Sequence, residues 1–198
     1  MYQGNNKTAL SSQHSIAEAM INHLKTMPYN SIRISSLCQE ADVSRQTFYS
    51  LFSTKDNVIR YILEYNYKFV PDGNQEASTM TLYDFCSNFV DYIENKKDIL
   101  RLLCKNKIML KFHKYLYSVF IDHPFIGGDV VTGDEAERAF KLELIAQYWA
   151  SALTGFANVE CREDNSLPRE KLIQMLMTLV SGDYTAKRFR APENKNNV

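Results

Sequence analysis

Five polar side chains follow one another closely in the first third of the chain: Arg45, Gln46, Thr47, Tyr49 and Lys55. A guanidinium group can hydrogen-bond guanine, a primary amide can bond adenine, and a threonine offers its hydroxyl or methyl group to thymine. A tyrosine hydroxyl and a lysine ammonium suit phosphate oxygens instead. If one surface carries all five, these residue types indicate contacts with a nucleic acid.

Two short helices joined by a tight turn would provide that surface. The apolar positions recur at the spacing of such a pair: Leu37, Ala41, Val43, Phe48 and Leu51. We expect the helices at about residues 35–41 and 45–52, with Ser44 as the N-cap of the second. Asp42 lies in the turn, where glycine is preferred, but aspartate tolerates a left-handed backbone. In such a helix-turn-helix, the second helix can enter the major groove of DNA.

The same pattern has a plainer interpretation. Short helices with one apolar face occur in many α-helical bundles, and Tyr49 would then be an ordinary half-buried tyrosine and Lys55 a solvated lysine. Against this, Lys55 stands at the start of a further helix, whose free amides favour anions. The pattern alone favours DNA recognition over simple packing.

Helical periodicity continues along the chain, which predicts an all-α fold with about nine helices. The first is expected at about residues 8–26, and the fourth begins near Thr54 and extends to Phe69. Later helices are expected around 82–93, 99–103, 108–120, 135–156 and 168–180, the last capped by Ser166. The best boundary is the break at 71–78. We divide the chain into a helix-turn-helix domain (1–54), a linking helix (55–70), a second helical domain (71–190) and a tail (191–198).

Composition narrows the class of protein. The 198 residues carry a formal net charge of zero, so a nucleic-acid contact must come from a local patch. No apolar run follows a basic start, and no stretch approaches the roughly 18 apolar residues of a membrane span, so we expect a cytoplasmic protein with no membrane partner. The four cysteines, Cys38, Cys86, Cys104 and Cys161, form no CxxC pair, which indicates reduced thiols.

Catalysis is not indicated. The sequence has no paired carboxylates on a helical face, no metal-spaced His or Cys set, no Gly-rich phosphate loop and no Ser-His-Asp arrangement. We therefore expect no enzyme, and assign no catalytic residue, no metal ligand and no cofactor.

Residues 16–59 resemble the N-terminal DNA-binding domain of the TetR family of transcriptional regulators. The segments that carry the resemblance are SIAEAMINHL and, further along the chain, IRISSLCQEADVSRQTFYSLFSTKDNVI. The family turn Ala-Gly-Val-Ser reads Ala-Asp-Val-Ser here, Tyr49 and Phe52 match the Tyr-x-x-Phe that ends the recognition helix, and Lys55 matches the lysine that follows. The resemblance implies a three-helix DNA-binding domain, a linking helix, and a C-terminal helical domain that dimerises and holds a small effector.

The resemblance also implies roles for single residues. Tyr49 and Lys55 would contact phosphate, and Arg45, Gln46 and Thr47 would read bases. Arg33 departs from the family, because it stands where a Thr or Ser commonly caps the second helix, so we expect Ser35 to supply the cap. Leu51 also departs, and no DNA contact is carried over to it. The predicted DNA-binding set is Arg33, Ser35, Ser44, Arg45, Gln46, Thr47, Tyr49 and Lys55.

The second domain offers candidate residues for an effector pocket, because pockets in helical bundles are mostly apolar with a few polar groups. Aromatic residues fit this description, and the candidates are Phe85, Phe89, Tyr92, Phe112, Tyr115 and Tyr148. An aromatic stripe at helical spacing is also typical of an ordinary core. The effector would be a small apolar or aromatic molecule.

The last two predicted helices carry apolar faces that suit a four-helix interface between two subunits, as the resemblance implies. The candidate residues are Leu144, Trp149, Leu153, Leu172, Met175, Leu176 and Leu179. Packing within one subunit is the alternative, and both can hold together. A two-fold homodimer would place two recognition helices about 34 Å apart, or a multiple of that, on a palindromic operator.

Basic residues are frequent between positions 96 and 114, where seven Lys or Arg residues occur. They would face DNA phosphate or an acidic effector, or form solvated helix faces.

These features together favour a ligand-responsive repressor of double-stranded DNA, released from its operator by a small-molecule effector. The sign of regulation is not visible in the sequence. The alternative is a TetR-like adaptor or coactivator that acts through a protein partner without a small-molecule ligand.

Overall fold

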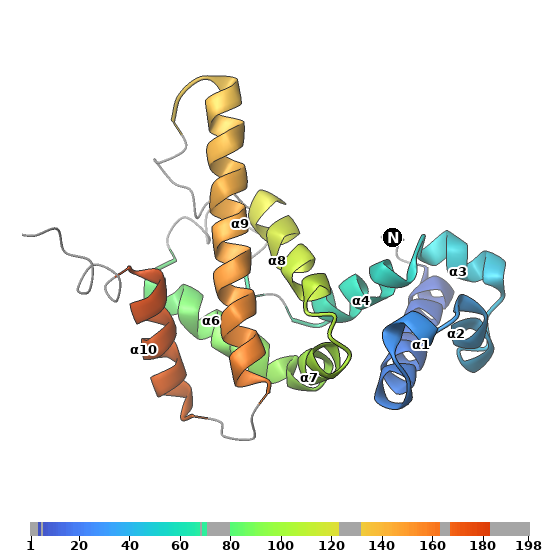
Figure 1. Ribbon diagram of the computed structural model, residues 1–198. Helices are drawn as coiled ribbons and strands as arrows, with labels where there is room; N and C mark the ends of the chain where they lie inside the picture. The colour runs from blue at the N-terminus through green and yellow to red at the C-terminus, as the bar shows by residue number, and fades with distance from the viewer. Residues whose placement is uncertain are drawn as a thin grey trace, which may run out of the picture.

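The computed structural model describes residues 4, 6–67, 69–70, 80–122, 132–162 and 167–182, and in these ranges every regular element is a helix (Figure 1). The nine α-helices of the described residues confirm the all-α prediction. They are α1 (Lys7–Thr26), α2 (Ile34–Glu40), α3 (Arg45–Leu51), α4 (Lys55–Glu64), α6 (Leu82–Asn95), α7 (Lys97–Lys105), α8 (Leu110–Asp122), α9 (Glu135–Glu160) and α10 (Arg169–Val180), with a 3-10 helix at Tyr29–Ser31. The predicted boundary at 71–78, the predicted cap Ser166 and the predicted tail at 191–198 lie outside the described residues.

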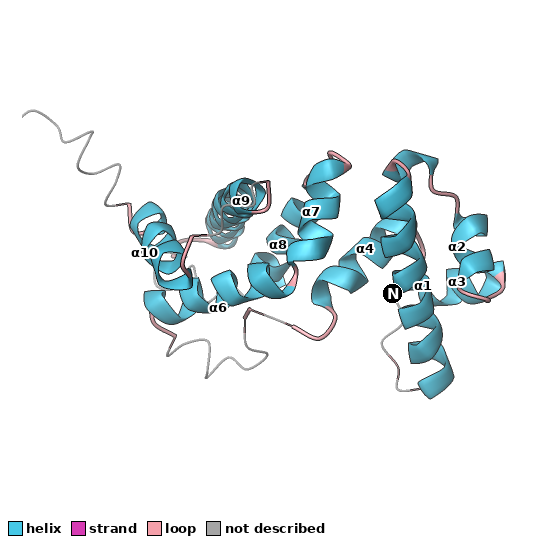
Figure 2. Cartoon of the chain, turned by 90° about the horizontal axis from the view of Figure 1, so that it is seen from below, coloured by secondary structure: helices cyan, strands magenta, loops and turns pink. Residues whose placement is uncertain are grey.

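The helices form two groups joined by α4 (Figure 2). Helices α1, α2 and α3 lie at one end of the molecule, and α9 and α10 lie at the other. Helix α8 packs along α9, and α10 packs against α6. Helix α4 contacts both α1 and α8, and α7 contacts α1, so the two groups share an interface. No helix in the described part of the chain is long and apolar enough to cross a membrane.

The turn between α2 and α3 forms as its residues predict. Asp42 has a φ of 50°, in the left-handed region that closes a helix C-terminus. The backbone N–H of Val43 donates to the carbonyl of Cys38 at 3.0 Å, which completes a Schellman motif. Ser44 then caps α3, because its side chain accepts a hydrogen bond from the backbone N–H of Thr47 at 2.9 Å. Both predictions for this turn are confirmed.

Helix α4 is shorter than predicted, because it ends at Glu64 and does not reach Phe69. Tyr65 is already extended, and Asn66 has a φ of 62°. The Lys96 ammonium group donates hydrogen bonds to the carbonyls of Ile62 and Tyr65. A cation at this position satisfies the last carbonyls of a helix and favours its negative end. The end of α4 is therefore stabilised by a residue 34 and 31 positions away from the two carbonyls, which local sequence patterns cannot reveal.

Aromatic side chains fill the space between α6, α8 and α9. Phe69 contacts the rings of Phe85, Phe89, Tyr92 and Phe120, with centroid separations between 5.2 and 6.3 Å. Such separations lie in the attractive range for aromatic pairs. This aromatic cluster forms the core of the second group of helices.

Helix α9 is longer than predicted and continues to Glu160 rather than ending near Phe156. Its N-cap Asp134 accepts a hydrogen bond from the backbone N–H of Glu137 at 2.9 Å. Residues 132–140 are all exposed, and Phe140 on this arm is 62% exposed. The first part of α9 thus extends as an arm with few neighbours among the described residues (Figure 1).

Replacing Asp42 with valine is expected to lower the free energy of unfolding by about 1–2 kcal/mol, because a β-branched side chain strains a left-handed backbone. Replacing Asp42 with glycine removes the Cβ atom and should leave stability unchanged or raise it by up to about 1 kcal/mol. Urea denaturation followed by circular dichroism measures both variants. Equal losses in the two would contradict the role of the left-handed turn.

Candidate nucleic-acid interface

Helix α3 separates an apolar inner face from a polar outer face. Phe48 is fully buried, and its ring packs against Phe52 at a centroid distance of 6.0 Å. On the opposite side, Arg45, Gln46 and Tyr49 are exposed, and the Tyr49 side chain reaches 56%. The packing of Phe48 and Phe52 therefore orients the predicted base-reading and phosphate-binding side chains toward solvent.

Two residues of the predicted DNA-binding set, Ser44 and Thr47, use their hydroxyl groups for hydrogen bonds at the start of α3. The Oγ atoms of Ser44 and Thr47 lie 2.8 Å apart, and Ser44 also caps α3. Thr47 is half-buried, unlike Arg45 and Gln46 before it. Any contact of these two residues with DNA would be made by groups that already hold the start of α3 in place.

Helix α2 begins without a side-chain cap. Arg33 occupies the N-cap position and is exposed, but its side chain makes no capping hydrogen bond. The prediction that Ser35 supplies the cap is wrong, because Ser35 already lies inside the helix, one residue after its start. A cap must precede the amides that it satisfies, so only a residue before Ile34 qualifies. The first amides of α2 therefore lack a side-chain acceptor.

Lys55 binds two backbone carbonyl groups of the segment between α1 and α2, which the sequence did not predict. Its Nζ atom donates to the carbonyls of Tyr29 at 3.0 Å and Ile32 at 2.8 Å, and it lies 4.4 Å from the centroid of the Tyr29 ring. Burial lowers the pKa of the Lys55 ammonium; the charge of Asp56 opposes this shift, and the smaller effect of the Lys111 charge adds to it. Two of its three donors are thus used within the protein, and its predicted phosphate contact would use the third.

A polar joint connects the segment between α1 and α2 with the start of α4 and with α8. Asp56, at the start of α4, accepts hydrogen bonds from the hydroxyl group of Tyr29 and from the ammonium group of Lys111 in α8. Burial acts to raise the pKa of Asp56, but the hydrogen bonds from Lys111 and Tyr29 outweigh it, and the net shift is downward. The carboxylate therefore stays charged between two elements that are far apart in sequence.

Asn106 completes this joint from the end of α7. Its Oδ1 atom accepts from the backbone N–H of Tyr29 at 3.0 Å, and its Nδ2 atom donates to the carbonyls of Leu24 at 3.1 Å and Leu102 at 2.9 Å. Sequence reasoning missed Tyr29, Asp56, Asn106 and Lys111 as a group. The sequence indicated only a turn around Pro28 and a polar residue after α7. Neither feature could predict that Asn106 bonds to residues about 80 positions away.

The predicted pocket residues divide into two groups. Phe85, Phe89, Tyr92, Phe112 and Tyr115 are buried and belong to the aromatic cluster. Tyr92 stacks on Phe112 and on Tyr115, with centroid separations of 6.1 and 6.2 Å. Tyr148 does not join them, because it is exposed on α9.

The predicted dimer residues also divide. Leu153, Leu172 and Leu176 are buried inside the subunit, and Trp149 packs its ring on Phe85 at 5.3 Å. The exposed members are Leu144, Met175 and Leu179. Packing within one subunit accounts for the first group, and a contact with a partner stays a prediction for the second. Two further residues of α9 are exposed: Tyr148, which was predicted to line the pocket, and Phe140, which was not among the predicted residues.

Solved structures resemble this arrangement along most of the chain. A TetR transcriptional regulator from Streptococcus agalactiae 2603V superposes with a TM-score of 0.52 and 18% identity, covering 88% of this chain and 96% of that one. The Lin0861 protein from Listeria innocua superposes with a TM-score of 0.63 and 12% identity, covering 91% and 95%. The chain has the TetR fold. No protein-family model and no curated protein matches the sequence.

The joint lies where Tyr29, the start of α4 and the end of α7 meet, and Asn106 provides a direct test of it. Replacing Asn106 with alanine is expected to lower the free energy of unfolding by about 1–3 kcal/mol, because the backbone N–H of buried Tyr29 loses its acceptor. Guanidinium denaturation measures the loss, and amide hydrogen exchange at Tyr29 should accelerate. Asn95→Ala is the matched control, since Asn95 bonds only within its own helix. Similar losses in both variants would contradict the assigned role.

Proposed function

We propose that this chain is a DNA-binding transcriptional regulator, a homodimeric repressor that binds a palindromic operator in the cytoplasm. The observation that carries the proposal is the division of α3, with Phe48 buried and Arg45, Gln46 and Tyr49 exposed on the other side. A short helix held from behind by apolar packing can enter a major groove with its first residues against base edges. The TetR fold supports the same assignment, and no catalytic step is part of it.

Phosphate contacts would hold the helix in register on the duplex. The exposed hydroxyl group of Tyr49 is one donor. The exposed guanidinium of Arg33 and the uncapped amides at the start of α2 are others, because free amides at a helix N-terminus favour anions. Ser35 belongs to this group through its backbone amide. Lys55 would contribute its remaining donor and its positive charge.

A second copy of the chain would cover the exposed apolar faces at the other end of the molecule. Phe140, Leu144 and Tyr148 recur every four residues along α9, which places them on one face of the helix. Met175 and Leu179 repeat the same spacing on α10. Isologous packing of such faces around a two-fold axis is the common way to form a four-helix interface.

A small apolar or aromatic effector would release the operator by binding better to a conformation in which the two recognition helices are wrongly spaced. The aromatic cluster supplies the apolar area, and Tyr92 and Tyr115 supply polar groups. The joint supports this route, since Asn106 and Lys111 of the second domain bond directly to Tyr29 and Asp56. Movement of α7 or α8 would therefore act on the DNA-binding domain.

The second candidate is an adaptor or coactivator that acts through a protein partner without a small-molecule ligand. The observation that favours it is the mutual packing of the five buried aromatic residues, each at most 5% exposed, which an effector would have to separate. Thermal unfolding in the presence of small molecules, compared with titration of a purified partner, separates the two candidates, because only a ligand of the native state raises the melting temperature.

Replacing Arg45 with alanine should change sequence preference, whereas Tyr49→Phe should weaken binding to all duplexes alike. Loss of a bidentate base contact costs about 1–3 kcal/mol at one position, and loss of one hydroxyl–phosphate hydrogen bond costs about 0.5–1.5 kcal/mol everywhere. Selection of binding sites from random duplexes, followed by anisotropy titrations at several salt concentrations, measures both effects.

The control for this pair is Tyr83→Phe, which removes a hydroxyl group bonded to Glu170 in the second domain, 3.2 Å away. It should leave DNA affinity unchanged. Unaltered sequence preference in the Arg45 variant would refute the reading role of α3. Lys55 is not varied, because its loss would also leave the carbonyls of Tyr29 and Ile32 without their donor.

Replacing Leu144 with glutamate is expected to convert a dimer into a monomer, because a carboxylate would be buried against its symmetry mate without a partner. Analytical ultracentrifugation measures the mass. Leu10→Glu, a change of the same type at an exposed leucine of α1, is the matched control and should remain dimeric. A dimeric Leu144 variant would show that the two-fold contact lies elsewhere.

A further inference from the structure

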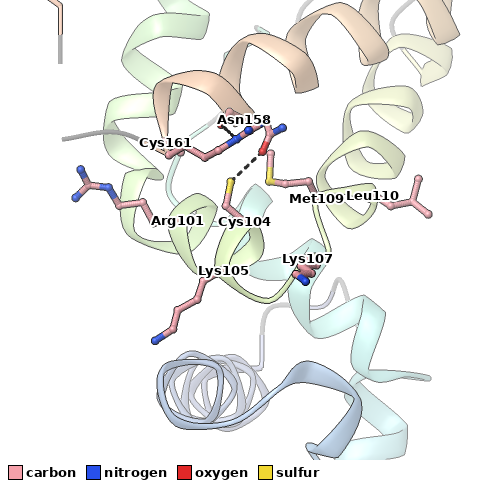
Figure 3. Close-up of a pocket in the computed structure, with 9 residues that line it drawn as sticks. Arg101, Cys104, Lys105, Lys107, Met109, Leu110, Asn158 and Cys161 are labelled. Carbon is pink, nitrogen blue, oxygen red and sulfur yellow. Dashed lines mark hydrogen bonds between the residues drawn. The ribbon is translucent and has the colours of Figure 1, made fainter. Parts of the chain in front are cut away.

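An open groove lies where the end of α7, the start of α8 and the end of α9 meet (Figure 3). Its volume is about 740 Å³. The residues that line it are Arg101, Cys104, Lys105, Lys107, Met109, Leu110, Asn158, Cys161 and Arg162. None of the aromatic cluster residues predicted as an effector pocket is among them, so this is a separate place in the fold.

The charged side chains among the described residues that line this groove are all positive. Two lysines and two arginines contribute to it, and the described residues that line it include no carboxylate. Lys105 and Lys107 are both exposed. Arg162 donates from Nε to the carbonyl of Asn158 at 3.2 Å, which fixes its guanidinium group against α9. Like charges held around one hollow create a local potential that attracts an anion.

The backbone at Lys107 adds a second observation. Lys107 has a φ of 58°, and the backbone N–H of Ile108 donates to the carbonyl of Leu103 at 2.9 Å. This is the left-handed position after a helix, where glycine or asparagine is the common residue. A lysine occupies this position although a left-handed backbone is less favourable for lysine than for glycine. The Lys107 side chain lines the groove.

The rest of the lining is apolar or uncharged. Leu110 is 63% exposed at the rim, and Met109 lies next to it. Burial raises the pKa of the Cys104 thiol, and burial, followed by its neighbours Cys104 and Glu160, raises the pKa of Cys161 to about 12. Both thiols are therefore uncharged parts of the groove wall, and the Cys104 thiol donates a hydrogen bond to Oδ1 of Asn158 at 3.4 Å (Figure 3).

The two lysines also reach a second, smaller groove. It has a volume of about 350 Å³ and lies between the end of α1, including Lys25, and the segment 105–107. Asn106 stands between the two lysines and bonds to Tyr29 and Leu24 of the DNA-binding domain. A ligand held by Lys105 and Lys107 would thus contact the turn that carries the joint.

We propose that the larger groove binds a small amphipathic organic anion, a phosphate monoester that carries an apolar group. Lys105, Lys107 and Arg162 hold the phosphate, whose two charges match several nearby cations. Met109 and Leu110 cover the apolar group. Binding itself is independent of DNA recognition; its effect on operator affinity, through Asn106, rests on the proposed function.

The test uses 1-naphthyl phosphate, whose fluorescence reports binding, with uncharged 1-naphthol as the comparison. The full-length chain is titrated as wild type, as the Lys105→Gln/Lys107→Asn double variant, and as the Lys7→Gln/Lys114→Gln double variant. Asparagine suits the left-handed position 107, so the first variant keeps its fold. The second removes two exposed lysines that lie outside the groove.

We expect wild type to prefer the phosphate over the naphthol and to lose this preference as salt is added. The groove variant should bind 1-naphthyl phosphate about tenfold more weakly than wild type, since each exposed ion pair contributes up to about 1 kcal/mol. The control variant should bind like wild type. Equal affinity in the two double variants, or no preference for the phosphate in wild type, would overturn the proposal. No DNA is present, so a failure of operator binding leaves this result unaffected.

Discussion

Tyr29 holds the two halves of the molecule in a fixed relation, and the rest of the structure depends on it. It belongs to a short 3-10 turn between α1 and α2, yet each of its polar groups bonds outside that turn. Its N–H donates to Asn106, its carbonyl accepts from Lys55, and its hydroxyl group donates to Asp56. Its ring lies beneath the cations of Lys55 and Lys111, at 4.4 and 5.2 Å, where a buried aromatic face attracts positive charge. A residue that is only 6% exposed thus bonds its polar groups to two residues of α4 and to Asn106 at the end of α7.

The orientation of α3 follows from this joint. Asp56 and Lys55 begin α4, and α4 supports the back of α3 through Tyr61, whose ring packs edge-on against Phe52 at 5.6 Å. A shift of α7 or α8 would pull on Asn106 or Lys111, and through Tyr29 on the base of α4. Coupling between sites requires an element with two arrangements that both sites bias. In this chain, α4 is suited to that task, because it contacts α1 in one group of helices and α8 in the other.

Local patterns in the sequence were sufficient where the structure is local. The left-handed turn at Asp42, the Ser44 cap and the burial of Phe48 all depend on residues within a few positions of one another, and they could be predicted. Three other features could not be predicted: the end of α4 at Glu64, the missing cap of α2 and the two hydrogen bonds of Lys55. The first and the third depend on partners that tertiary folding brings close, and the second depends on where α2 begins. The same limit applies to the leucines of α9 and α10. Periodicity identifies an apolar stripe, but it does not distinguish Leu153, buried in its own subunit, from Leu144, which is exposed.

The two places where a small molecule would act differ in energetic cost. A ligand entering the aromatic cluster must separate rings that already contact one another, and each such pair contributes about 0.5–1.5 kcal/mol beyond its area burial. Part of the binding free energy would therefore be used to open the core, which is how a ligand changes a conformation rather than merely occupying it. The groove at the end of α7 is already open, and a ligand there displaces only water. It would stabilise the arrangement of Lys105, Asn106 and Lys107 as it stands, and with it the hydrogen bonds that hold Tyr29. The two proposed ligands would therefore have opposite effects on one joint: binding in the core would loosen it, and binding in the groove would reinforce it.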